Sequence, residues 1–132
     1  MAQINPSMMI ERDFNLDESM NVTRFVAAPQ YFPPNHFMMR CLRLQGHEAG
    51  PAQDLWLGVS MIEPGGHTSL DASVVEKHYV VLEGSVTVIT EEGEVELNRH
   101  DSCRLAPGES RKLENRTETL AAILLAMPFP KG

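Results

Sequence analysis

Cysteine is scarce in this sequence, which contains only Cys41 and Cys103 among its 132 residues. Two cysteines form at most one disulfide, so a fold held together by a disulfide framework is excluded. The opening residues MAQINPSMMIERDFN lack the basic region and apolar stretch of a secretory signal. We therefore expect a cytoplasmic protein whose two thiols are reduced, buried and inert.

Positive charge and long apolar runs are also in short supply. Asp and Glu number 18 against 11 Lys and Arg, which gives a net charge of −7. Because nucleic acids and anionic membranes repel an acidic surface, neither is an expected partner. The longest apolar run, Leu120 to Met127, is far shorter than the roughly 20 residues that a membrane-spanning helix needs.

The first thirty-six residues differ from the rest of the chain. They mix isolated apolar residues with Pro29, Pro33 and Pro34 and show no sustained periodicity. A disordered tail is one interpretation, but the segment is rich in apolar side chains for a solvated tail. We predict that residues 1–36 form an arm that packs on the main domain or on a second subunit, with Tyr31 and His36 as candidates to cover its open end.

From residue 37 onward, short apolar or β-branched segments alternate with turn residues. The segments are FMMRCLRL, LWLGVSMI, SVVEKHYVVL, SVTVIT, EVEL, CRLA, SRKLEN and TLAAILLAM. Such spacing, without helical periodicity between the segments, is typical of an all-β sandwich or closed barrel. Gly93, in TEEGE, stands where a tight hairpin needs positive φ. The sequence therefore predicts one all-β domain over residues 37–127, followed by a short tail, 128–132.

Two segments, EPGGHTSLDASVVEKHYVVLEGSVTV (63–88) and RHDSCRLAPGESRKLENRTE (99–118), resemble the two motifs of the cupin superfamily. The matching positions are Pro64-Gly65, Val80 to Gly84, Asp101, Pro107-Gly108 and Asn115, and they align without gaps. The resemblance implies a double-stranded β-helix, a jelly-roll barrel of two facing sheets with a pocket in its mouth. It also implies a homodimer.

The metal ligands of cupins, a His-x-His pair, a glutamate and a third histidine, are all replaced. Their positions fall on Asp71 and Ser73, on Lys77, and on Arg111. Neither a lysine ammonium nor a guanidinium offers a lone pair to a metal. We therefore expect no metal or other cofactor at the usual cupin position.

The replacing residues predict a site for a small organic anion instead. Arg111 would anchor a carboxylate, while Lys77 would act as a base, with Asp71, Ser73 and Tyr79 completing the binding site. Burial beside Arg111 would lower the pKa of Lys77 and Asp71 would oppose that shift, so its sign stays open. In an alternative interpretation, Asp71, Lys77 and Arg111 pair with one another as a structural plug.

Three functions remain open at this stage. The first is a metal-independent lyase, isomerase or hydrolase that acts on a small carboxylate. The second is a binding or sensor module that uses the same pocket without chemistry. The third is a metal enzyme in which a one-residue slip turns Glu76 and His78 inward beside His67, joined by His36 or His47. Trp56 is interpreted as a core or interface aromatic residue.

Overall fold

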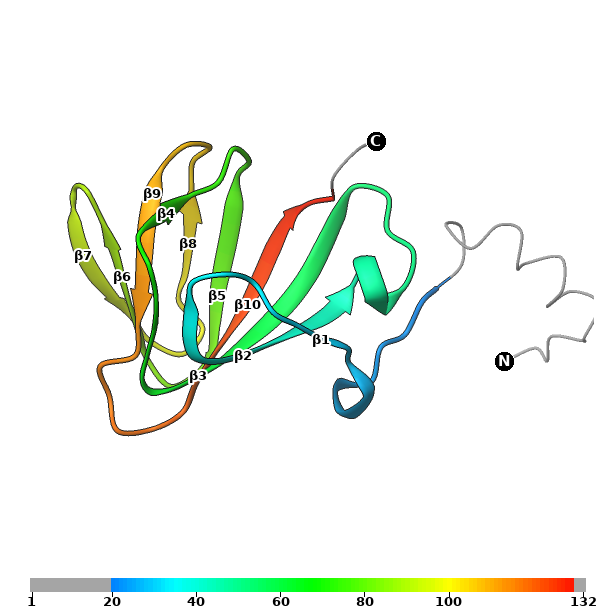
Figure 1. Cartoon of the computed structure of the whole chain (residues 1–132), viewed down its shortest axis with the longest axis horizontal. Helices are drawn as coiled ribbons and strands as arrows, with labels where there is room; N and C mark the ends of the chain where they lie inside the picture. Colours follow the sequence, from blue (N-terminus) through cyan, green and yellow to red (C-terminus); the bar gives the residue numbers. More distant parts are fainter. Residues whose placement is uncertain (1–19, 130–132) are drawn as a thin grey trace, which may run out of the picture.

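The computed structural model describes residues 20–129, which form a nearly closed β-barrel (Figure 1). The described strands are β1 (Gln30–Tyr31), β2 (His36–Gln45), β3 (Leu55–Thr68), β4 (Asp71–Ala72), β5 (Lys77–Glu83), β6 (Val86–Thr90), β7 (Gly93–Leu97), β8 (Ser102–Leu105), β9 (Ser110–Glu114) and β10 (Ala121–Pro128). Two single-turn 3-10 helices, η2 (Phe25–Ala27) and η3 (His47–Ala49), complete them. None of the described helices has the length and apolar character needed to cross a membrane. The predicted all-β barrel is confirmed.

The described strands join into one sheet, with β3 as the element that links the two sides of the barrel. The strand order is β7-β6-β9-β3-β10-β5-β8, with β2 beside β3 and β4 beside β9. The first half of β3 pairs with β10, whereas His67 near its end pairs with Glu114 of β9. The turn comes at Gly65, which has φ of +83°. The two facing sheets of the predicted jelly roll are therefore continuous through β3.

The turn that follows β5 requires a glycine. Gly84 has φ of +71°, and a Cβ atom at this position would lie 2.7 Å from the carbonyl oxygen of Leu120. Only glycine tolerates both the backbone conformation and this close approach. Gly93 also has a positive φ, as its hairpin predicts. These turns fix the register of the strands between them, and so decide which side chains point into the barrel.

Several strand boundaries differ from the prediction. Residues 73–76 of the segment SVVEKHYVVL are not strand, because the Ser73 hydroxyl accepts the backbone N–H of Val75 and forms a local turn. Conversely, β3 runs beyond Ile62 to Thr68, and β1 lies within the arm. Cys41 is buried and Cys103 is half-buried, and both are free thiols.

The described part of the arm, residues 20–36, lies on the barrel. Asn21 donates to the carbonyl oxygen of Ala49 at 2.9 Å, and Tyr31 pairs with Cys41 of β2. Its remaining residues, 1–19, are outside the described residues. The barrel core is apolar and includes Ile62 and Val81, which are fully buried. The arm therefore adds a short strand beside β2 and brings aromatic side chains to the barrel mouth.

Candidate functional site

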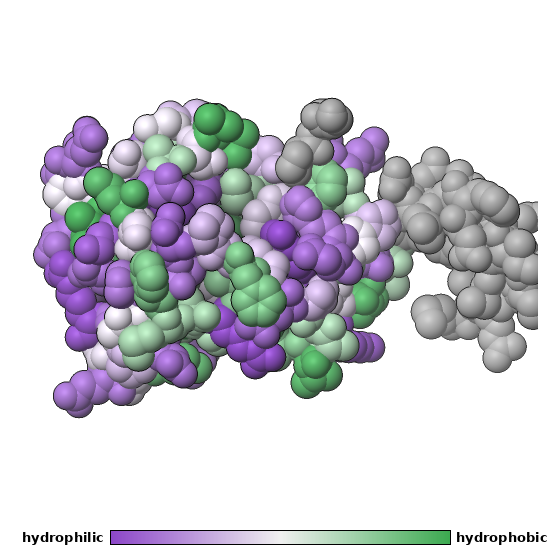
Figure 2. Space-filling view, in the orientation of Figure 1, coloured by the Kyte–Doolittle hydropathy of each residue, from purple (hydrophilic) through white to green (hydrophobic). Residues whose placement is uncertain are grey.

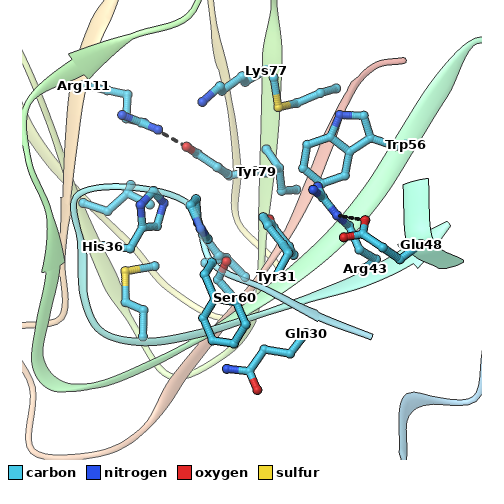
Figure 3. A pocket seen from close by; sticks show the side chains of 17 residues that line it. Gln30, Tyr31, His36, Arg43, Glu48, Trp56, Ser60, Lys77, Tyr79 and Arg111 are labelled. Carbon is cyan, nitrogen blue, oxygen red and sulfur yellow. Dashed lines mark hydrogen bonds and ion pairs between the residues drawn. The ribbon is translucent and has the colours of Figure 1, made fainter. Parts of the chain in front are cut away.

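The mouth of the barrel holds a cavity of about 570 Å³ (Figure 3). Its apolar floor and walls come chiefly from β9 and β10, whose lining side chains are Leu113, Ile123, Leu125 and Met127. Its polar and aromatic lining comes from the arm, β2, η3, β3, β5 and β9, and consists of Gln30, Tyr31, Phe32, His36, Arg43, Glu48, Trp56, Ser60, Lys77, Tyr79 and Arg111. The cavity therefore combines an apolar interior with polar groups that approach from different strands.

One end of the cavity contains Lys77, Tyr79 and Arg111. Lys77 and Tyr79 alternate inward from β5, and Arg111 reaches in from β9. Arg111 is only 5% exposed; its Nε donates to the phenolic oxygen of Tyr79 at 2.9 Å, and its Nη1 donates to the backbone oxygen of Asp71 at 3.3 Å. The guanidinium is thus oriented by neutral acceptors. Among the described residues it forms no ion pair with a carboxylate.

The environment of Lys77 destabilises its charged form relative to water. Burial, and secondly the Arg111 guanidinium, lower the pKa of Lys77 to about 8, although Asp71 opposes the shift. The structure thus shows that the pKa of Lys77 is shifted downward, a direction that the sequence left open. Burial also lowers the pKa of His36, with the two cations contributing in the same direction. At neutral pH, Lys77 is therefore mainly an ammonium with an accessible neutral fraction.

Asp71 and Ser73, the other two predicted binding residues, do not line the cavity. Asp71 is exposed on β4, and its carboxylate accepts the backbone N–H of Ala72. The Ser73 hydroxyl is engaged by the turn at Val75. The backbone oxygen of Asp71 accepts from Arg111, and its charge opposes the lowering of the Lys77 pKa. Its side chain does not pair with Lys77 or Arg111. The ion-paired plug among these three residues is therefore not formed.

The residues of the slipped register do not come together either. Glu76 and His78 face away from the cavity, where Glu76 pairs with His78 at 3.0 Å and with Arg104. His67 stacks on Phe37, with ring centroids 4.9 Å apart. The pairing of β5 with β8 and β10 turns Lys77 and Tyr79 toward the cavity, so the slipped register is not the one adopted. No three His, Cys, Asp or Glu side chains within residues 20–129 are grouped so that they could hold a metal ion.

The side chains at the usual cupin metal position are also poor metal ligands. Lys77 and Arg111 are both cationic at neutral pH and have no lone pair in that state. Tyr79 is neutral, because burial raises its pKa above the usual range. His36 is the one imidazole that lines the cavity within residues 20–129, whereas His47 packs outside it against Trp56. These side chains do not fit a transition metal.

A second polar group, which the sequence did not identify, lies across the cavity. Arg43 on β2 forms an ion pair with Glu48 on η3, with Nε and Oε1 3.0 Å apart. Its guanidinium carbon lies 3.6 Å from the ring centroid of Tyr31 and 4.7 Å from that of Trp56. The alternation of side chains along β2 could have indicated this position. It places Arg43 on the same face as Met39, whose side chain also lines the cavity.

The sequence is similar to that of one curated protein over most of its length. The chain is 39% identical over 111 residues to the β-D-galactosidase Rv1717 of Mycobacterium tuberculosis. The match covers 84% of this chain and 96% of the mycobacterial protein. No protein-family model matches the chain.

Solved structures of cupins resemble the barrel closely. The polyketide cyclase RemF from Streptomyces resistomycificus superimposes with a TM-score of 0.76 at 17% identity, over 85% of this chain and 81% of RemF. An RmlC-like cupin from Shewanella frigidimarina gives a TM-score of 0.69 at 13% identity, over 86% and 94% of the two chains. At these identities the likeness shows the fold alone. The chain therefore has the predicted fold of a small cupin, and by sequence it belongs to the family of the mycobacterial protein.

Proposed function

We propose that the cavity binds a small organic anion without the usual cupin metal, and that Lys77 exchanges a proton with it. The observation that carries the proposal is the charge of the cavity lining. Arg43, Lys77 and Arg111 line the cavity, and within the described residues Glu48 is the one carboxylate that does so. A cavity with such an excess of positive charge favours an anionic ligand.

Arg111 is suited to hold the anion. Tyr79 and the backbone of Asp71 fix its orientation, while N–H groups on its terminal nitrogens remain for a carboxylate. Because the group is buried and lacks an ionic partner among the described residues, a ligand carboxylate would supply the missing countercharge. The position of Arg111 therefore supports the proposal of anion binding.

Lys77 is suited to move a proton next to that anion. Its neutral amine would take a proton from the carbon adjacent to the ligand's carbonyl or carboxylate group, and the C–H electron pair would pass to the oxygen held by Arg111. Return of the proton to a different carbon completes an isomerisation. Expulsion of a leaving group by the same electron pair completes a lyase reaction.

Calorimetry with small carboxylates, together with a turnover assay, tests this function. We expect Arg111→Ala to weaken carboxylate binding by about 1.5–3 kcal/mol, the scale of a hydrogen bond to a charged group. Lys77→Ala should abolish turnover while largely sparing binding. Lys112→Ala is the matched control, because that lysine pairs with Glu114 and does not line the cavity.

The results separate enzyme from binding protein. Binding that depends on Arg111 without turnover of any carboxylate would identify a binding or sensor module. Failure of all small carboxylates to bind the wild-type protein would overturn the proposal.

Glycoside hydrolysis is a second candidate, favoured by the 39% identity to a protein named as a β-D-galactosidase. Most glycosidases use two carboxyl groups that flank the scissile bond. Here Glu48 is the one carboxylate in the described lining. Its own backbone N–H and, less strongly, Arg43 lower its pKa, so it is ionised and suited to act as nucleophile or base. The Lys77 ammonium would have to protonate the leaving group.

Hydrolysis of a chromogenic β-D-galactoside distinguishes the two candidates. If the protein is a galactosidase, wild-type protein should release the aglycone and Glu48→Gln should abolish the release. A wild-type protein without such activity, which still binds carboxylates through Arg111, would eliminate this candidate and leave the first.

A further inference from the structure

We propose that Arg43 is a second anion-binding group of the cavity, so that the ligand is a dianion with an anionic group at each end and an apolar middle. This inference rests on the proposed function, because it assumes that Arg111 holds the first anionic group. It names the substrate class as dicarboxylates, or carboxylates that carry a second anionic group.

Two aromatic rings, those of Tyr31 and Trp56, contact the guanidinium of Arg43. The rings of Tyr31 and Trp56 meet edge to face, with centroids 5.9 Å apart and an interplanar angle of 89°. The guanidinium lies in the corner that the two rings form. Contacts of a cation with two aromatic faces fix its position while neutralising none of its charge. The group is thus preorganised as a cation.

The hydrogen-bonding capacity of Arg43 is only partly used. Its Nε donates to Glu48, and its two terminal nitrogens have no hydrogen-bond partner among residues 20–129. A guanidinium carries five N–H donors, so four remain for a ligand. They form the planar fork that suits a carboxylate. Glu48 is largely exposed, so it neutralises the guanidinium less than a buried carboxylate would.

The two arginines lie on opposite sides of the cavity. Figure 3 shows Arg111 near one end, beside Lys77 and Tyr79, and Arg43 at the other, beside Trp56 and Glu48. Apolar side chains of β10, including Ile123 and Leu125, line the cavity together with both arginines. A ligand that satisfies the whole cavity therefore needs two separated anionic groups joined by an apolar segment.

Matched pairs of dicarboxylates and monocarboxylates test this inference directly. Succinate and butyrate, adipate and hexanoate, and suberate and octanoate differ by one carboxylate at constant chain length. By calorimetry, we expect at least one dicarboxylate to bind about tenfold more tightly than its monocarboxylate, as one charge-assisted contact allows. Arg43→Met should reduce this preference to about twofold or less, without a comparable loss of monocarboxylate binding.

Two further variants keep the test decisive if Arg43→Met disturbs the arm. Glu48→Gln removes the carboxylate that competes for Arg43 and should increase the preference for the dicarboxylate. Arg104→Met is the matched control, because Arg104 also pairs with a glutamate, Glu76, but outside the cavity. It should leave the preference unchanged.

The possible failures can be told apart. If monocarboxylates bind through Arg111 but no dicarboxylate is preferred, the inference is wrong and the proposed function stands. The same conclusion holds if the preference for the dicarboxylate survives in Arg43→Met and is unchanged in Glu48→Gln. If neither class of ligand binds to the wild-type protein, the proposed function itself fails.

Discussion

Arg111 and Tyr79 form a hydrogen bond inside the barrel, with 2.9 Å between Nε and the phenolic oxygen, although their exposures are only 5% and 3%. The pair joins β9 to β5 across the mouth of the cavity. Burial raises the pKa of Tyr79, more than Arg111 lowers it, so the phenol stays neutral. The buried cation is consequently oriented without being neutralised, and its charge remains available to a ligand.

Tyr79→Phe should therefore weaken both the fold and anion binding. The substitution removes the acceptor of the Arg111 Nε donor and preserves the ring. A buried hydrogen bond to a charged group contributes about 1.5–3 kcal/mol, and we expect a loss of free energy of unfolding within that range in urea titrations. Calorimetry should show weaker carboxylate binding. A variant with unchanged unfolding and unchanged binding would show that the bond does not orient Arg111.

Lys77 should make stability depend on pH between about 8 and 10.5. Its pKa is lowered from 10.5 to about 8 in the folded protein, so the unfolded chain binds more protons in this interval. The contribution of Lys77 to stability therefore rises as pH increases through this window, because the cost of burying the charged form is relieved. Below pH 8 the cost is fully present.

Lys77→Met tests this linkage by removing the titrating group. The variant should be more stable than the wild-type protein at pH 7, and the difference in melting temperature should shrink toward pH 10. Lys112→Met, which changes a partly exposed lysine paired with Glu114, should show no such trend. A stability difference that is constant from pH 7 to 10 would contradict the lowered pKa.

Asn115 should be the polar residue on which the fold depends most. Its Nδ2 donates to the carbonyl oxygens of Ile62 and Thr119, at 2.8 and 2.9 Å, and its Oδ1 accepts from the backbone and hydroxyl of Thr117. Asn115→Ala removes the partner of the buried Ile62 carbonyl and of the part-buried Thr117 groups, and should cost about 3 kcal/mol. The exposed Asn98→Ala is the control, with an expected loss within about 1 kcal/mol. Equal losses in urea titrations would contradict the role assigned to Asn115.

We propose that the chain forms a homodimer through the free edge of β2. Within residues 20–129, this strand pairs with β3 on one side, whereas on the other it pairs with β1 only at Cys41 and Leu42. The exposed residues Phe37 and Met38 lie on the uncovered stretch. Figure 2 shows a face on which apolar residues are scattered among polar ones, as is normal for a protein surface. A free edge that carries apolar side chains is open to pairing with another strand.

Light scattering at micromolar concentration tests the assembly. We expect a dimer mass for the wild-type protein and a monomer mass for Phe37→Glu, in which a charge stands at the edge. Val95→Glu, which changes an exposed apolar residue of β7, is the control and should remain dimeric. A monomer mass for the wild-type protein would refute the proposal.

The sequence predicted the barrel and one end of its cavity because turns determine register. Pro64-Gly65 and Gly84 bracket the first motif, and with both turns fixed the alternation of β5 sends Lys77 and Tyr79 inward. Arg111 follows from the second motif by the same reasoning. These three residues required only local patterns and one alignment without gaps.

The rest of the cavity lining depends on local side-chain bonding and distant packing, which the sequence pattern did not reveal. Asp71 and Ser73 match motif positions, but they bond to their own backbone neighbourhood and do not reach the cavity. The place of Arg43 depends on Tyr31 and Glu48, which approach from the arm and from η3. A sequence pattern assigns a side chain to a face of a strand, but not to the neighbours that tertiary packing brings to it.

The position of β2 has a consequence for regulation. One strand supplies His36, Met39 and Arg43 to the cavity, and the outer edge of the same strand is mostly unpaired among the described residues. A second chain that paired with that edge would contact the same strand that carries these cavity residues. If the proposed dimer forms there and a ligand binds it more tightly than the monomer, that ligand strengthens dimerisation by the corresponding factor, and dimerisation raises ligand affinity in return.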